Sequence, residues 1–456
     1  MDILQEVIEN FIKEIMGLSL AEGLTPFLDQ AESRCTKFLL EFTRGTLRLY
    51  DQYLLEHKEE RRGYEVVKKD VSRTLETKFG TLHFLRRYYV NRWTGEYSYL
   101  LDKLLDIKSY ERIERGLGAE LCTLACSHSY QVSSQLASGG RVSKQTVMQL
   151  IRQVDEEPLV REKSKKPVRS IHLQCDEDHV AMQDGSCRLT KLCVIHEAIK
   201  PISGQKKHYL PDKFIVVEDK SCTSNEKYWF KIADAIEDRY GKMEKLKIYI
   251  HGDGASWIKA GLGYLPHSKF VLDKYHFSKY LTPVAGDVKE AKALLWEGVK
   301  SGHPKQVEAV LEGLIDQGIC TEDKAEAFHT YYQNNRQGIS IWYSDPESGR
   351  SCAEGLVSHI LSDRLSSRPK AWGEKGLGSV TRLRAHLLNG GTITAQDFKR
   401  PQTASEQPYF KDEAKQRAGQ YVSDFMPCVS NALKMVKAGT STYHIFDTIK
   451  NGGYLF

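Results

Sequence analysis

A largely apolar run that ends at an aspartate between two glycines constrains the fold of this chain more than any other feature. Residues 246–250 read Leu-Lys-Ile-Tyr-Ile, a pattern that predicts a strand, and Gly252-Asp253-Gly254 follows after one histidine. A helical pattern begins directly after the second glycine. In α/β sheets, ligand and metal sites gather where strands end and helices begin, so Asp253 is a candidate site residue. An ordinary Asp-Gly turn between a strand and a helix is the alternative interpretation.

The residues around this turn predict an α/β domain of defined strand order. A strand candidate at 171–176 runs into Asp176-Glu177-Asp178, which is alternatively only a solvated acidic turn. The other elements are strands at 179–183 and 189–195, a further strand or strand arm at 209–217, a helix at 228–240, the strand and helix around Asp253, and a short strand at 270–272.

This order is the layout of a ribonuclease-H-like domain: three strands joined by hairpins, then a helix, a strand, a helix, a strand and a helix. In that fold the first and fourth strands lie side by side. We therefore expect Asp176 and Asp253 to meet at one edge of the sheet.

Length and composition describe a globular chain of several domains. The chain has 456 residues, 41% hydrophobic and 27% charged, which predicts two to four domains. No apolar run reaches the roughly 18 residues that a membrane span needs, and the first residues lack a secretion-signal profile. The ten cysteines are scattered singly, which favours a reducing cytoplasm over a disulfide framework. We expect a cytoplasmic, nucleoid-associated protein.

The positive charge is unevenly placed. The formal net charge is +5, and between His57 and Arg92 ten Lys and Arg stand against five Asp and Glu. Residues 161–169 form a second basic stretch that is typical of a linker. Basic clusters on a balanced protein favour a polyanionic partner such as DNA or RNA, although solvated basic faces are common.

The basic segment near the N-terminus has the pattern of a β-hairpin. Residues 1 to about 60 are helical in pattern, and strands at 73–78 and 81–89 then flank Phe79-Gly80. Arg86 and Arg87 near the end of the hairpin are candidates for contacts with DNA phosphates, with tyrosines beside them that could stack on bases. An ordinary amphipathic hairpin is the alternative.

A helix-turn-helix is predicted between residues 130 and 152. A short helix at 130–137 is followed by Gly139-Gly140 and by a second helix over 142–152. Lys144 and Gln145 lie at the start of the second helix, where base contacts are made in such motifs. A simple helical hairpin has the same pattern.

The region after the α/β pattern is helical. Residues 285–345 have apolar faces at helical spacing, which predicts an α-helical insertion rather than a catalytic part. The next helix begins near Glu354, and because Ser351-x-x-Glu354 matches a capping box, Glu354 has a purely structural alternative. Three carboxylates from neighbouring elements would suit two Mg²⁺ ions, which bind carboxylate oxygens and activate water or a 3′-hydroxyl for phosphodiester chemistry.

Several blocks of this sequence resemble a known family. The blocks are Asp176–Val180, Gly252–Lys259, Leu272–His276, Glu354 and Arg368-Pro369, in that order. They are similar to DDE transposases of bacterial insertion sequences, in the Mutator-like superfamily and in a branch long catalogued as uncharacterised. The resemblance covers most of the chain and is densest between Asp176 and Trp372.

The resemblance implies roles for individual residues. Asp176, Asp253 and Glu354 would be the catalytic and metal-binding acids, holding two Mg²⁺ or Mn²⁺ ions. Asp178 is the rival of Asp176, and Asp363 is the weaker rival of Glu354. The remaining residues singled out are Arg364, Arg368 and Lys370 as phosphate contacts, and Asp273 and His276 as a possible structural pair where the superfamily often has Cys-x-x-His.

Two cysteine clusters are candidates for zinc sites. Cys122 and Cys126 precede His128, and Cys187 and Cys193 precede His196. Neither cluster has four ligands at the spacing of a zinc finger, so structural zinc is not expected.

The resemblance implies a transposase that cleaves and joins DNA. It would bind double-stranded transposon ends and target DNA as a homo-oligomer, with no membrane partner. The alternatives are a DNA-binding protein without transposition activity and a structure-selective nuclease on the same fold. The expected segments are 1–96 (helices and basic hairpin), 97–160 (helix-turn-helix region), 170–284 (first part of the core), 285–345 (insertion), 346–385 (end of the core) and 386–456 (C-terminal helices).

Overall fold

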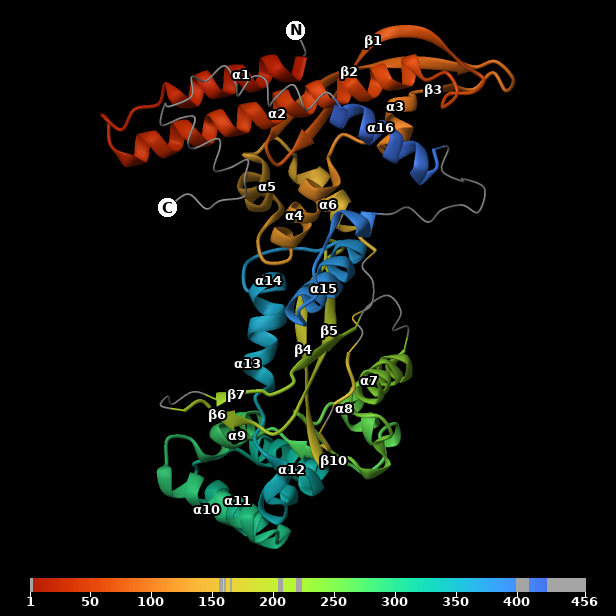
Figure 1. Ribbon diagram of the computed structural model, residues 1–456. Coiled ribbons are helices and arrows are strands. Elements are labelled where there is room, and N and C mark those ends of the chain that lie inside the picture. Colours follow the sequence, from red (N-terminus) through yellow and green to blue (C-terminus); the bar gives the residue numbers. More distant parts are fainter. Residues whose placement is uncertain are drawn as a thin grey trace. The chain divides into compact units, whose positions relative to one another are not determined.

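The computed structural model divides the chain into two compact units (Figure 1). The structure describes residues 3–155, 159, 161–164, 166–203, 208–218, 224–398 and 410–424. Unit 1 comprises residues 1–121, 130–147 and 394–456, and unit 2 comprises residues 122–129 and 148–393. Among the described residues, no helix is both long and apolar enough to cross a membrane.

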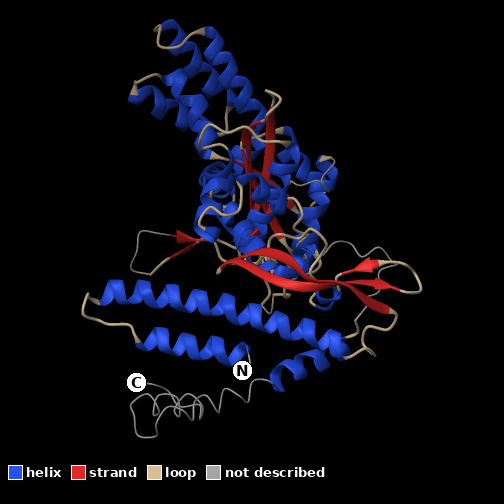
Figure 2. Cartoon of the chain, turned by 90° about the horizontal axis from the view of Figure 1, so that it is seen from above, coloured by secondary structure: helices blue, strands red, loops and turns tan. Residues whose placement is uncertain are grey.

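Unit 1 combines two long helices with a three-stranded sheet. Helices α1 and α2 lie side by side (Figure 2), and Phe11 of α1 stacks on Phe38 of α2 with ring centroids 4.2 Å apart. The sheet has the order β1-β2-β3, and Thr77 pairs with Gly80 at the turn, which confirms the hairpin around Phe79-Gly80. The elements are α1 (Ile3–Met16), α2 (Leu24–Glu56), β1 (Tyr64–Thr77), β2 (Gly80–Asn91), β3 (Tyr97–Ser98) and α3 (Leu100–Leu104).

Helices α4 (Arg115–Ala125), α5 (Tyr130–Ser138) and α6 (Lys144–Ile151) follow the sheet. Between α5 and α6 the chain turns at Gly139 and Gly140, whose φ angles of 58° and 81° favour glycine. The backbone N–H of Thr146 donates to Ser143 Oγ at the start of α6. The two helices predicted around the glycine turn are therefore present.

The described part of the C-terminal segment belongs to unit 1. Helix α16 (Asp412–Asp424) packs on α2: Tyr421 donates to Glu56 at 2.7 Å, and Arg417 pairs with Glu60 at 2.6 Å. The predicted C-terminal helices beyond Asp424 lie outside the described residues.

Unit 2 is built on a five-stranded sheet of order β10-β9-β4-β5-β8. Strand β4 pairs with β9 in parallel and with β5 antiparallel, β8 is antiparallel to β5, and β10 is parallel to β9. The pairing of β4 with β9 confirms that the first and fourth strands are neighbours. The strands are β4 (Ser170–Ala181), β5 (Cys187–His196), β8 (Phe214–Val217), β9 (Lys247–Gly252) and β10 (Ser268–Leu272), and a separate small hairpin is formed by β6 (Lys200–Pro201) and β7 (His208–Tyr209).

The first strand is longer than predicted. The sequence pattern placed separate strands at 171–176 and 179–183 with acidic residues between them, whereas β4 runs without a break from Ser170 to Ala181. Asp176 and Asp178 are only 8% and 7% exposed, so these acids are not a solvated turn. They lie within the strand because its polar face is covered by a helix rather than by water.

The helices of unit 2 share one hydrophobic core with the sheet. The segment predicted as an insertion is part of this core. Its residues Phe328 and Ile339 pack in the same cluster as Leu272 and Phe277. The helices are α7 (Asn225–Tyr240), α8 (Ser256–Ala260), α9 (Lys274–Ala285), α10 (Lys289–Ser301), α11 (Pro304–Asp316), α12 (Glu322–Ser344), α13 (Ala353–Val357), a π-helical turn (Ser358–Ser362), α14 (Asp363–Leu365) and α15 (Glu374–Leu388).

Candidate functional site

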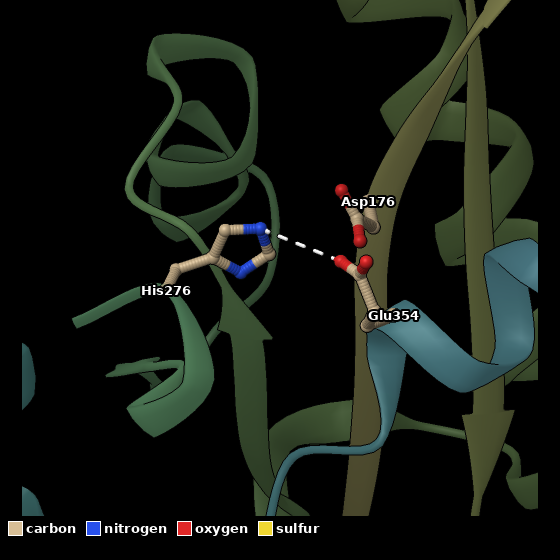
Figure 3. A group of neighbouring side chains, drawn as sticks. All are labelled: Asp176, His276 and Glu354. Carbon is tan, nitrogen blue, oxygen red and sulfur yellow. Dashed lines mark ion pairs between the residues drawn. The ribbon is translucent and has the colours of Figure 1, made fainter. Parts of the chain in front are cut away.

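Three side chains from distant parts of the sequence meet in unit 2. Asp176 of β4, His276 of α9 and Glu354 of α13 each direct a potential ligand atom into one space, and these atoms lie within 4.8 Å of one another (Figure 3). Among the described residues, this is the one group of three or more His, Cys, Asp or Glu side chains with that geometry.

The alternation of β4 directs Asp176 into this group. Ile171, Leu173 and Cys175 point to the core, so Asp176 points to the opposite face. Its Oδ1 accepts a hydrogen bond from the Glu177 N–H at 2.8 Å. Burial raises the pKa of Asp176 to about 6; the backbone bond and His276 oppose the rise, and the negative charges of Asp253 and Glu354 add to it. A buried carboxylate beside like charges is typical of a functional site.

His276 is fixed by Asp273 at the start of α9. Asp273 accepts from the Tyr275 N–H at 2.9 Å and caps the helix, and its second oxygen lies 3.2 Å from His276 Nδ1. The hydrogen bond to Asp273 raises the pKa of His276, against the effect of burial. His276 Nε2 then faces Glu354 Oε2 at 3.7 Å. The Asp273–His276 pair, predicted as a possible structural pair, therefore contributes a ring nitrogen to the site.

Glu354 lies in the first turn of α13 with 52% of its side chain exposed. Lys279 Nζ of α9 lies 3.9 Å from Glu354 Oε2. The capping-box alternative is not observed, because Ser351 Oγ accepts from the Ala353 N–H and the helix has no cap bond from the side chain of Cys352, its N-cap residue. The Glu354 carboxylate faces the site instead.

Asp253 lies beside this group rather than within it. Its Oδ1 accepts from the Ala255 N–H at 2.8 Å, and its main-chain carbonyl accepts from Tyr331 Oη at 2.8 Å. Its charge acts on both Asp176 and His276, raising the pKa of each. Asp253 directly follows β9, which pairs with the strand of Asp176, but its carboxylate is not a member of the three-residue group.

The two rival acids have other partners. Asp178 is buried and accepts hydrogen bonds from Ser362 Oγ at 3.1 Å and from Ser366 Oγ at 2.9 Å. Asp363 is exposed and pairs with Arg384 at 3.2 Å. Neither carboxylate belongs to the three-residue group, and each is bound by other side chains of the fold.

The segment that carries Glu354 is fastened along the polar face of β4. Gln174 Oε1 accepts from the Cys352 N–H at 3.0 Å, before Glu354, and Ser362 and Ser366 bond Asp178 beyond it. Arg384 donates to the carbonyl of His359 at 2.8 Å and to that of Ile360, both in the π-helical turn. These contacts set the position of Glu354 relative to Asp176.

Three histidines extend the polar face of the sheet beneath the site. His172 Nδ1 lies 3.1 Å from His251 Nε2, and the rings of His172 and His196 stack with centroids 5.4 Å apart. All three are buried. Burial and the neighbouring His196 lower the pKa of His172 to about 4, and burial also lowers the pKa of His196 and His251.

Three arginines predicted to contact DNA are structural. Arg86 is 5% exposed, forms an ion pair with Asp102 and lies 3.5 Å from the centroid of the Tyr99 ring. Arg87 forms an ion pair with Asp51 of α2. Arg364 is 3% exposed and donates to the carbonyl of Ala125 at 2.9 Å. Their guanidinium groups bind other parts of the protein, and contact of these three residues with DNA stays a prediction.

The other predicted DNA contacts are differently placed. Lys370 Nζ donates to the carbonyl of Arg364 at 2.7 Å, so it also has a partner within the fold. Arg368 is exposed, and Lys144 and Gln145 are exposed at the start of α6. These last three are available to a partner.

Lys279 is a site residue that the sequence reasoning did not single out. Asp273, His276 and Lys279 recur every three residues directly after a strand, and this spacing places them along one side of a helix. That pattern is the signal that could have identified Lys279.

Comparisons with known proteins place the chain in a family without an assigned activity. Residues 17–402 match the family described as Uncharacterised protein family (UPF0236). Two relatives from Caldanaerobacter subterraneus subsp. tengcongensis, both named UPF0236 proteins, are 33% identical over 409 and 394 residues. The alignments cover 86% and 84% of this chain, and 85% and 83% of the relatives. The chain therefore belongs to the uncharacterised protein family UPF0236.

Proposed function

We propose that this protein is a metal-dependent transposase of the DDE class, which cleaves DNA at the ends of a mobile element and joins them to target DNA. The observation that carries the proposal is the convergence of Asp176 and Glu354 on one space, with Asp253 at the end of the adjacent strand. The strand order and pairing around them support assignment of unit 2 to the ribonuclease-H-like class.

The donor set fits divalent cations. Asp176 and Glu354 offer carboxylate oxygens, the ligands that Mg²⁺ and Mn²⁺ prefer, and Asp253 offers a third from the neighbouring turn. The Nδ1 of His276 is held by Asp273, as the second nitrogen of a metal-binding histidine usually is. An imidazole nitrogen among carboxylates favours Mn²⁺ over Mg²⁺. Two bound cations would activate the attacking water or 3′-hydroxyl and neutralise charge on the leaving oxygen.

The chain's own residues have separate tasks in this proposal. Asp176, Asp253 and Glu354 hold the cations, and burial, with a smaller effect of the neighbouring acids, raises the pKa of Asp176, a cost that a bound cation would offset. Asp273 orients His276, and Lys279 brings a positive charge near the phosphodiester. The exposed Lys144 and Gln145 of α6, together with Arg368, contact double-stranded DNA. Two copies of the chain acting together would hold both ends of the element.

The names of the relatives support mobility of the gene. One relative's name joins eleven locus designations, and another's joins four. Transposition multiplies a gene within one genome, so names that join several designations are consistent with the proposal.

The test is cleavage and joining of DNA carrying the ends of the element. With Mn²⁺ or Mg²⁺, the wild-type protein is expected to nick terminal DNA and to join the freed end to a target. Asp253→Ala is expected to abolish both reactions, while Asp234→Ala, which removes an exposed carboxylate on α7, retains them. Cleavage of branched DNA without joining would indicate a nuclease instead, and binding without cleavage would indicate a DNA-binding protein.

A further inference from the structure

Helix α12 meets the sheet through a single stripe of residues. Tyr331, Asn335, Gly338 and Trp342 follow one another at intervals of four, three and four, so they lie on one face of the helix. Trp342 Nε1 donates to the carbonyl of Leu272 at 2.7 Å, and a Cβ on Gly338 would lie 2.7 Å from Phe270. The C-terminal half of the stripe is thus pressed against β10.

The N-terminal half of the stripe contacts the turn that carries Asp253. Tyr331 Oη donates to the Asp253 carbonyl at 2.8 Å, and the ring of Tyr331 stacks on Tyr280 of α9 with centroids 3.9 Å apart and an angle of 10° between the rings. The Tyr331 hydroxyl is therefore held in place and directed at the turn.

Asn335 closes the same turn from the next position along the stripe. Gly254 has a φ of 98°, and a Cβ there would lie 2.4 Å from Asn335 Oδ1. Asn335 is 4% exposed, and its Nδ2 donates to the Tyr331 carbonyl at 2.9 Å. Within the described residues its Oδ1 has no hydrogen-bond partner. This side chain is thus wedged against the glycine backbone.

We propose that α12 is part of the metal site: Tyr331, backed by Asn335, is a positioning residue that fixes the Gly252-Asp253-Gly254 turn and so the Asp253 carboxylate. The inference rests on the proposed function, since it assigns Asp253 to a cation. One carboxylate oxygen of Asp253 is already bonded to the Ala255 N–H, so fixing the backbone also fixes the direction of the other oxygen. Residues that orient a ligand in this way commonly change metal affinity tenfold or more when altered.

The experiment measures Mn²⁺ binding to the full-length protein without DNA, by the loss of the free-ion electron paramagnetic resonance signal. Tyr331→Phe is expected to weaken binding about tenfold. Tyr332→Phe is the matched control, because it removes a hydroxyl from the adjacent residue, whose oxygen is buried without a partner among the described residues. It is expected to bind as the wild type does.

A double variant separates positioning from general damage. If Tyr331 acts through Asp253, Tyr331→Phe causes no further loss of Mn²⁺ binding in an Asp253→Ala background. Wild-type affinity in Tyr331→Phe, or a further tenfold loss in the double variant, would overturn the inference.

Hydrogen exchange distinguishes failure of this inference from failure of the proposed function. Absence of Mn²⁺ binding by the wild type would count against the metal-dependent function itself. The positioning role of Tyr331 is then tested by hydrogen exchange of the 252–255 amides. This exchange is expected to be faster than in the wild type in Tyr331→Phe and unchanged in Tyr332→Phe. Equal exchange in the two variants would overturn the positioning role.

Discussion

Strands β2 and β4 each carry a buried charge, and the two charges differ in their surroundings. Arg86 of β2 is in phase with the core residues Leu82 and Phe84, and its guanidinium is paired with Asp102. Asp176 of β4 points away from the core, and it lies among His276, Asp253 and Glu354, whose charges act on its pKa in opposite directions. Removing one member of a buried ion pair destabilises a fold, whereas a buried carboxylate beside other acids is a candidate ligand for the cations of the proposed function.

The hairpin segment shows why net charge alone does not predict which charged residues are exposed. The hairpin segment is rich in Lys and Arg, but strand alternation and the facing Asp51 and Asp102 decide which of them reach solvent. The acidic triplet of β4 is the opposite case, because Asp176 and Asp178 are buried and Glu177 accepts a hydrogen bond from Trp257 Nε1 at 2.7 Å. The face of the strand on which a charged residue lies predicts its exposure better than the net charge of the segment does.

Replacing Glu354 should give the largest effect. Glu354→Gln removes a charged ligand from the group with Asp176 and His276, and DNA cleavage is expected to fall at least about a thousandfold, or about 4 kcal/mol. Single-turnover cleavage rates check this. Asp363→Asn, an exposed carboxylate in the same helical segment, is the control and should keep most of the activity. Comparable losses in the two variants would contradict the assignment of Glu354.

Arg86→Leu tests the other side of the comparison. Removing one member of a buried ion pair leaves Asp102 uncompensated, so the free energy of unfolding should fall by about 3 kcal/mol. Urea denaturation measures the change. Lys68→Ala, an exposed position on β1, should leave stability unaltered. A variant of Arg86 with normal stability and weakened DNA binding would restore the original interpretation of the hairpin.

The buried histidines predict a loss of stability in mild acid. Above pH 6.5 both folded and unfolded chains hold neutral His172; between pH 6.5 and about 4 only the unfolded chain takes up the proton, because burial lowers the folded pKa to about 4. The free energy of unfolding should therefore fall by about 2 kcal/mol from pH 7 to pH 5 for His172 alone. His196 and His251 shift in the same direction and add to the loss.

Denaturation curves at pH 7 and pH 5, compared between wild type and His172→Gln, check this prediction. The glutamine variant should show a smaller difference between the two pH values, since it has lost one titrating group. An identical pH dependence would mean that His172 is not the group responsible.

Lys144→Ala should give the smallest effect. Lys144 is exposed at the start of α6, so its loss should weaken DNA binding by less than about 1 kcal/mol and reduce the slope of log affinity against log salt by about one. Binding titrations at several salt concentrations measure the slope. Lys13→Ala on α1 changes net charge equally and should leave the slope unaltered.

Much of the fold could be predicted because its signals are local. The long helices, the hairpin around Phe79-Gly80 and the glycine turn between α5 and α6 each follow from apolar period or turn residues. Trp257 and Ile258, apolar residues of the helix after Asp253, are buried in the core. The pairing of the first and fourth strands followed from the order of elements.

The remaining features depend on contacts between distant segments. Three consecutive acids looked like a turn because nothing local reveals that Ser362 and Ser366 cover Asp178. The helical region after α9 was predicted as an insertion without a part in the site, because its contact with the Asp253 turn joins residues far apart in sequence. The place of His276 in the three-residue group was not predicted for the same reason, since Glu354 reaches it from a helix beyond that region.

The π-helical turn at Ser358–Ser362 has a consequence for how this sequence can change in length. A π turn holds one residue more than an α turn, so deleting one residue there would convert it to α-helix with little rotation of the residues that follow. Glu354 would stay in place, and Arg364 and Ser366 would keep their partners. A single-residue deletion should therefore be tolerated better in this turn than in the middle of α15, where it would rotate the following residues by about 100°, and a deletion scan would reveal the contrast.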